Sequence, residues 1–307
     1  MTESNHHGHL IGERDTLRVI DCKTCGYAHL DKFPSEAELD SFYVSDFWQK
    51  EKAGALERYL AQREWMTAHH TGWLQLASRH TAGGSLLDVG CGYGFFIADA
   101  RSKGWTCWGI EPNSEAANYA QQHTASIGYP STTPIWRGGW DNGDGELIKI
   151  IADKYDCISA LWLIEHLPNP LEFLKWAHSR LVIPGGVLLV AVPNDFTHIQ
   201  MNANAYVRRP FWWIDKTHLN YFTPSSIANL LGLAGFQIVE RQTMFEMESW
   251  LTTPENDYTD IPEIGDEVHG SVRLGDMMMT MNERLIYYGN QARCGIGREI
   301  ILIAKAV

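Results

Sequence analysis

Asp88 and three glycines are the residues whose types and spacing most directly suggest chemistry. They lie in the stretch LLDVGCGYGFF, residues 86–96, where the acid ends an apolar run and Gly90, Gly92 and Gly94 follow it. Glycine lacks a Cβ, so the backbone can turn sharply and a ligand can lie directly against it. A pyrophosphate gains nothing from the acid, whereas a ligand with ammonium and sulfonium groups is attracted to it. The stretch therefore predicts a site for a cationic small ligand.

A second acid, Glu111, follows the glycines at the spacing of about 20 residues that is also found in dinucleotide-binding proteins. The dinucleotide pattern G-x-G-x-x-G would need glycine at position 95, where the chain has Phe95. The third glycine comes one place early, which argues against a dinucleotide-dependent oxidoreductase.

These residues need a scaffold, and the chain predicts one by alternating apolar strand-like runs with segments of helical spacing. We expect strands over 85–89, 105–110, 134–137, 155–161, 186–192 and 236–241, and helices over 93–103, 113–123, 170–182 and 224–233. Such alternation predicts a doubly wound, mostly parallel α/β sheet. Ligands of these sheets bind beyond the carboxyl ends of the strands, where the glycines lie.

Composition excludes several classes of protein. The net charge is −12, and no stretch gathers Lys or Arg into a stripe, so we expect no nucleic-acid partner. No apolar run approaches the roughly 20 residues of a membrane span, and no secretory leader is recognisable. We therefore expect a cytoplasmic protein without a membrane partner. Six cysteines are too sparse for a disulfide framework in 307 residues.

Over 86–307 the chain resembles the class I S-adenosylmethionine-dependent methyltransferases. Five stretches carry the resemblance in order: LLDVGCGYG, GIEPN, YDCISALWLIEHLPNP, LVIPGGVLLVAVPN and GREIILIAK. The last resembles the antiparallel final strand that separates this fold from the dinucleotide-binding one. The resemblance implies a Rossmann-like sheet of seven strands with an antiparallel last strand, and S-adenosylmethionine as cofactor.

The resemblance also implies which residues bind the cofactor. The methionine part is enclosed by Asp88, Gly90 and Gly92, with Cys91 between the glycines. The ribose hydroxyls are held by Glu111, which Pro112 follows. The sulfonium and the methionine end are bordered by Leu161, Trp162 and His166. The adenine position fits less well. We choose Asp141 for it, with Asp144 as an alternative, and a solvated turn is an equal alternative to both.

Two insertions are expected to cover the acceptor, over about 194–223 and 244–297. The first contains THLNYFTPSSI, which resembles a stretch in a branch that modifies sugars and small metabolites. His218 is the candidate general base, because imidazole titrates near neutral pH. Alternatively, His218 only packs or caps the next helix, and His166 is a rival base. In the second insertion, the helical stretch with its methionine cluster is expected to be core or an oligomer contact. The acidic, turn-rich stretch before it is either a solvent-exposed loop or a lid.

The N-terminal segment, 1–50, resembles the end of a small zinc ribbon and precedes the methyltransferase domain expected over 51–307. Cys22 and Cys25 stand at zinc-knuckle spacing, and His6 and His9 have the same spacing earlier. Ribbons of the related sugar-modifying enzymes have two cysteine pairs, so histidines would replace the first pair here. Four protein ligands would make such a zinc structural. The alternative is a histidine-rich tail without metal.

The resemblance implies methyl transfer to a small-molecule acceptor. A sugar or nucleotide-linked sugar hydroxyl is the favoured acceptor, because the N-terminal segment and the THLNYFT stretch both resemble the sugar-modifying branch. The alternatives are O-methylation of a phenolic or quinone-like metabolite and a non-catalytic scaffold that binds S-adenosylmethionine. The sequence does not identify the oligomeric state.

Overall fold

The computed structural model describes residues 6–35, 38–39, 54–125, 134–141 and 154–307. Its centre is a seven-stranded sheet of β4 (Ser85–Val89), β5 (Thr106–Glu111), β6 (Ile135–Arg137), β7 (Cys157–Leu161), β8 (Val187–Pro193), β10 (Phe236–Gln242) and β11 (Glu299–Ala306). The strands lie in the order β10-β11-β8-β7-β4-β5-β6. Strand β11 is antiparallel to both neighbours, and the other neighbouring pairs are parallel. The expected doubly wound sheet with an antiparallel last strand is confirmed.

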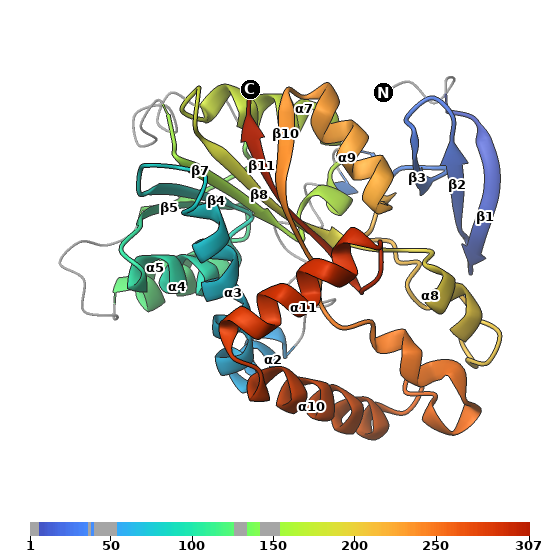
Figure 1. Ribbon diagram of the computed structural model, residues 1–307. Coiled ribbons are helices and arrows are strands. Elements are labelled where there is room, and N and C mark those ends of the chain that lie inside the picture. Colours follow the sequence, from blue (N-terminus) through green and yellow to red (C-terminus); the bar gives the residue numbers. More distant parts are fainter. Residues whose placement is uncertain (1–5, 36–37, 40–53, 126–133, 142–153) are drawn as a thin grey trace.

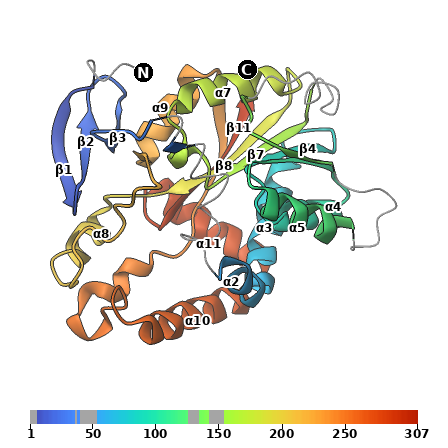
Figure 2. The same cartoon turned by 180° about the vertical axis from the view of Figure 1, so that it is seen from behind.

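Helices cover both faces of this sheet (Figures 1 and 2). Successive side chains of a strand point to opposite faces, so the buried strand β8 contributes to two hydrophobic cores. Leu188 and Val190 pack with α7 (Pro170–Arg180) and α9 (Pro224–Leu233). Leu189 and Ala191 pack with α3 (Arg63–Ala77) and α4 (Phe95–Ser102). The sheet therefore lies between two layers of helices.

The predicted elements of the sheet domain agree with the structure to within a few residues. The strand over 85–89 and the helix over 224–233 have the expected bounds. Helix α9 is well specified locally, since Pro224 stands in its first turn and Thr223 and Ser226 form a capping box. Helix α5 (Ser114–Ala125) follows β5 as expected.

The segment over 194–223 contains two regular elements that we did not predict from the sequence. It contains helix α8 (His198–Ala203), whose first turn is capped by the Thr197 side chain accepting from the Gln200 amide. It also contains the short strand β9 (Asn220–Tyr221). Strand β9 has too few residues to be recognised from periodicity, and it forms because another strand pairs with it.

That partner belongs to the N-terminal segment. Strands β1 (Gly8–Arg14), β2 (Leu17–Cys22) and β3 (Tyr27–Leu30) form a second, antiparallel sheet, and β9 is its fourth strand. Figure 1 shows this sheet beside the central one. The N-terminal segment is therefore joined to the segment that carries His218. The boundary expected near residue 50 lies outside the described residues.

The insertion over 244–297 folds into two short 3-10 helices, η4 (Met247–Thr252) and η5 (Pro254–Asn256), and the helices α10 (Pro262–Met278) and α11 (Met281–Arg293). Asp276 of α10 accepts hydrogen bonds from Trp65 Nε1 at 2.8 Å and from Tyr288, and its Oδ2 lies 3.2 Å from His69 Nε2. These buried contacts attach the insertion to α3. In the described parts of the chain, no helix is long and apolar enough to cross a membrane.

Candidate functional site

The carboxyl ends of β4, β5 and β7 open into a cavity of about 1330 Å³. Both insertions contribute to its wall, His218 from the first and residues such as Met247 and Tyr258 from the second. Every residue expected to bind the cofactor also lines it: Asp88, Gly90, Cys91, Gly92, Glu111, Pro112, Asp141, Leu161, Trp162 and His166. The structure thus brings the cofactor candidates and the candidate base into one space.

The glycine loop has the backbone conformation that its sequence indicates. Gly90, Gly92 and Gly94 have φ values of 73°, 52° and 77°, in the left-handed region that favours glycine. A Cβ at Gly94 would lie 2.9 Å from Cβ of Ala120, so helix α5 packs directly against the loop. The amide of Gly90 donates to the Ile110 carbonyl at 2.8 Å, which holds the loop against β5.

Glu111 is held in place by the backbone around it. Its Oε2 accepts from the Gly92 amide at 3.0 Å, and its Oε1 accepts from the Asn113 amide at 2.9 Å. The side chain is buried, with 4% of the residue exposed. The carboxylate therefore links the glycine loop of β4 to the end of β5 and faces the cavity in a fixed orientation.

Asp88 lies buried at the end of β4, where the Ser159 hydroxyl donates to Oδ1 at 2.7 Å. Burial raises the pKa of Asp88 to about 7; the Ser159 hydrogen bond lowers it, and the charge of Glu111 raises it further. A cation bound beside Asp88 would favour the ionised form.

The pH dependence of Asp88 gives a prediction. The native state keeps the proton up to about pH 7, whereas an unfolded Asp loses it near 3.8, so rising pH destabilises the native state between these values. Without cofactor, Asp88→Asn is expected to gain stability relative to the unchanged protein as the pH rises from 4 to 8. Thermal melts across this range measure the difference. A difference that does not vary with pH would contradict the raised pKa.

His166 and His218 lie side by side, with ring centroids 4.9 Å apart. His166 Nδ1 lies 2.6 Å from the Thr217 carbonyl, which can only accept, so Nδ1 carries the proton and Nε2 has the lone pair. Ligand atoms of Glu165, His166 and His218 all lie within 4.8 Å of one another. This arrangement suits proton transfer, and the same donor set would suit a divalent cation, so activity should be measured with and without a chelator.

Another part of the cavity wall carries the carboxyl groups of Glu248 and Glu299 beside the guanidinium group of Arg298. Trp162 Nε1 donates to Glu299 Oε2 at 3.0 Å, and Arg298 Nε lies 3.0 Å from Glu248 Oε1. Burial raises the pKa of Glu299 to about 7, against the lowering effect of Arg298 and Trp162. Within the described residues, Glu248 Oε2 is buried and has no hydrogen-bond partner. This wall offers hydrogen-bond acceptors to a ligand.

Glu165, Glu248 and Glu299 are parts of the site that we did not predict from the sequence. Glu165 had a usable signal, because it precedes His166 in the IEH stretch. Glu248 and Glu299 had none, since they come from distant segments that only the fold brings to the cavity. Asp141 lines the cavity but is exposed, and Asp144 lies outside the described residues.

The N-terminal metal candidates are only partly brought together. Ligand atoms of His6, Cys22 and Cys25 lie within 4.8 Å of one another, and the fourth member of the cluster is His29. His9 points elsewhere: its side chain is 68% exposed and its Nε2 lies 3.8 Å from Asp21 Oδ2. The hairpin of β1 and β2 pairs His9 with Asp21, which separates it from the cysteines.

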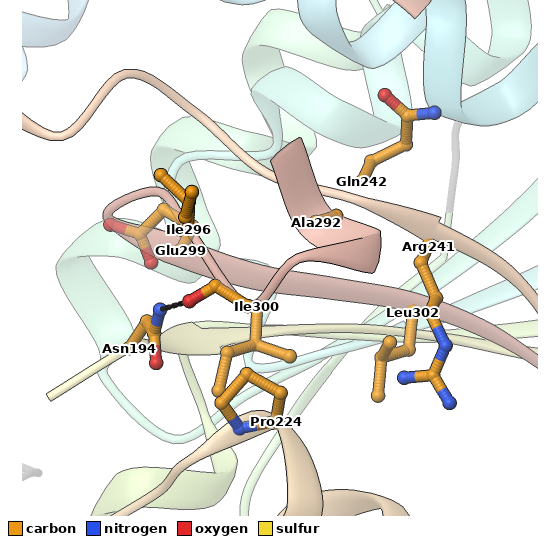
Figure 3. Close-up of a pocket in the computed structure, with 10 residues that line it drawn as sticks. Asn194, Pro224, Arg241, Gln242, Ala292, Ile296, Glu299, Ile300 and Leu302 are labelled. Carbon is orange, nitrogen blue, oxygen red and sulfur yellow. Dashed lines mark hydrogen bonds between the residues drawn. The ribbon is translucent and has the colours of Figure 1, made fainter. Parts of the chain in front are cut away.

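A second cavity lies where the segment after α11 meets β10, β11 and the start of α9 (Figure 3). Its volume is about 10 Å³, the space of a single water molecule. Asn194 Nδ2, at its edge, donates to the Gly295 carbonyl at 3.3 Å. Glu299 is common to both cavities, but this one is too small for a substrate.

The domain built on the central sheet is similar in sequence to known methyltransferases. A family model described as a methyltransferase domain matches residues 58–241, more than half of the chain. Ubiquinone biosynthesis O-methyltransferases from Azorhizobium caulinodans and Ruegeria pomeroyi are each 27% identical, over 177 and 183 residues. These matches cover 56% of this chain and 66% and 68% of the two relatives, so the chain spans about two thirds of their length.

A solved structure has a similar fold. The magnesium protoporphyrin IX methyltransferase ChlM of Synechocystis PCC 6803, solved with bound S-adenosylhomocysteine, superposes with a TM-score of 0.54. The match covers 89% of this chain and 100% of that one at 12% identity, and at that identity it shows the fold alone. The cofactor of this family is S-adenosylmethionine. The chain belongs to the methyltransferase domain family, and its resemblance to the class I S-adenosylmethionine-dependent methyltransferases is confirmed.

Proposed function

We propose that this protein transfers the methyl group of S-adenosylmethionine to a hydroxyl oxygen of a small aromatic acceptor, with His218 as general base. The observation that supports this most is that His218 lines the same cavity as Asp88 and Glu111. Cofactor and acceptor would thus share one cavity, as a displacement between them requires.

The residues at the ends of β4 and β5 fit the cofactor. Two buried carboxyl groups, Asp88 and Glu111, stand beside glycines whose backbone a ligand can approach closely. Asp88 would hold the ammonium group and Glu111 the ribose hydroxyls, through charge-assisted hydrogen bonds. When bound, the cofactor supplies a methyl group activated by a positively charged sulfur.

The histidine pair would handle the proton of the acceptor. His218 would take the proton from the hydroxyl as the oxygen attacks, and neutral imidazole is suited to this near pH 7. His166 is a positioning residue, because its bond to the Thr217 carbonyl ties it to the residue before His218. The first insertion therefore supplies the base, and the IEH turn of η3 (Ile164–His166) supports it.

An aromatic hydroxyl suits this site better than a sugar hydroxyl does. The pKa of a phenol, about 10 as in tyrosine, is closer to that of imidazole, so the proton transfer is less unfavourable. Trp162, Trp212 and Trp213 line the cavity and offer surfaces against which a ring can pack. The ubiquinone O-methyltransferases among the relatives support the same class of acceptor.

A sugar hydroxyl is the second candidate, favoured by Glu248 Oε2, which is buried at the cavity without a partner among the described residues. A polyol could donate to it. A nucleotide-linked sugar fits less well, because, in the part of the chain that the structure describes, the carboxyl groups that line the cavity outnumber its three arginines, Arg63, Arg273 and Arg298.

Release of S-adenosylhomocysteine across a panel of phenols, quinols, free sugars and nucleotide sugars tests the proposal. We expect turnover with phenols or quinols, unaffected by a chelator that does not remove tightly bound zinc. Turnover with sugars alone would overturn the aromatic acceptor. If no compound of the panel is turned over and calorimetry shows that the protein binds S-adenosylhomocysteine, a non-catalytic scaffold would be favoured.

A further inference from the structure

The four residues of the N-terminal cluster have the spacing of a tetrahedral metal site. His6 Nδ1 lies 3.2 Å from His29 Nε2, 3.3 Å from Cys25 Sγ and 3.8 Å from Cys22 Sγ. Zinc bonds of about 2.0–2.1 Å to nitrogen and 2.3 Å to sulfur imply tetrahedral edges of roughly 3.3 Å between nitrogens and 3.6 Å between nitrogen and sulfur. The observed separations agree with these edges.

The groups around the cluster orient its donors. His29 Nδ1 lies 2.6 Å from the Leu30 carbonyl, so it carries the proton and leaves the Nε2 lone pair facing His6. Metal-binding histidines commonly donate their second nitrogen to a carbonyl in this way. Cys22 and Cys25 are joined by a tight turn in which the Gly26 amide donates to the Cys22 carbonyl at 2.9 Å. Cys22 and His29 are buried.

The cluster is connected to the histidine pair of the cavity through two short strands. In the pairing of β3 with β9, His29 stands opposite Asn220, and the Leu30 amide donates to the Leu219 carbonyl at 2.9 Å. Asn220 Nδ2 in turn donates to the Leu167 carbonyl at 2.7 Å, and the Leu219 amide donates to the Glu165 carbonyl at 2.8 Å. Strand β9 thus touches β3 on one side and the turn with His166 on the other.

We propose that His6, Cys22, Cys25 and His29 bind one divalent cation of the zinc class, and that this ion positions His218 and His166 through β3 and β9. Binding displaces the two thiol protons to solvent and leaves thiolate ligands. All four positions of the ion are occupied by protein, so it carries no reactive water. The consequence for catalysis rests on the proposed role of His218, whereas metal binding itself does not.

Metal content tests the ligand set without any acceptor. The full chain, refolded or grown with zinc, is expected to hold about one zinc per chain by elemental mass spectrometry, and its cobalt form should show thiolate charge-transfer and tetrahedral absorption bands. Cys25→Ser and His29→Gln should each reduce the bound metal at least fivefold. His9→Gln is the matched control and should bind as the unchanged protein does. Absence of metal from the unchanged protein, or full binding by both ligand variants, would overturn the site.

Hydrogen exchange tests the connection to the cavity. Removing the metal is expected to speed exchange roughly tenfold or more in peptides over 160–168 and 214–222, while the peptide over 85–94 stays unchanged and reports an intact sheet. Asn220→Ala should keep the metal and still speed exchange over 160–168. Unchanged exchange in both peptides after metal removal would overturn the positioning role. Because neither measurement needs turnover, these failures are distinct from failure of the proposed function.

Discussion

Replacing His218 with alanine is expected to lower kcat by about 100-fold or more, with the affinity for S-adenosylhomocysteine unchanged. The loss follows from removing the group that accepts the hydroxyl proton, in a cavity where His166 lies beside it with a ring separation of 4.9 Å. Steady-state kinetics with the best acceptor of the panel, together with calorimetry, measures both quantities.

The control for this substitution is His198→Ala, in the same insertion. His198 is exposed at the start of α8 and does not line the cavity, so its removal should leave kcat unchanged. His166→Ala should lower kcat by a smaller factor than His218→Ala does, because His218 remains to accept the proton. A parallel loss of kcat and cofactor affinity in the His218 variant would mean that His218 supports the fold and is not the base.

Glu111→Ala is expected to weaken the binding of S-adenosylhomocysteine by about 1–3 kcal/mol, or roughly 5- to 150-fold. The variant would lose the carboxylate acceptors proposed for the ribose hydroxyls. It would also lose the bonds from the Gly92 and Asn113 amides that hold the glycine loop to β5. Calorimetry at constant ionic strength measures the affinity, and a thermal melt reports the stability of the variant.

Two further variants separate the loss of the Glu111 hydrogen bonds from the loss of a negative charge. Glu115→Ala removes the same charge from an exposed position in the first turn of α5, and it should leave the affinity unchanged. Glu111→Gln keeps the length of the side chain and one accepting oxygen, so its loss of affinity should be smaller than that of Glu111→Ala. Unchanged affinity in Glu111→Ala would remove the proposed role at the ribose.

The sequence was sufficient to predict the central sheet and the group of residues that meets at the ends of β4 and β5 in the cavity. Strands β4 and β8 are short apolar runs, helix α9 begins at a Pro within a capping box, and the glycines follow β4 directly. Each of these signals is local, because periodicity, turn residues and caps act over a few neighbouring positions. Asp88 and Glu111 end neighbouring parallel strands, so the topology alone places them at the same edge.

The tertiary structure decided which distant residues meet. His29, and not His9, completes the N-terminal cluster, because the pairing of β1 with β2 sets His9 opposite Asp21. Strand β9 exists only as a partner of β3, and Trp162 meets Glu299 across 137 positions of the chain. Side-chain packing and strand pairing between remote segments determine such contacts, and a local pattern carries no information about them.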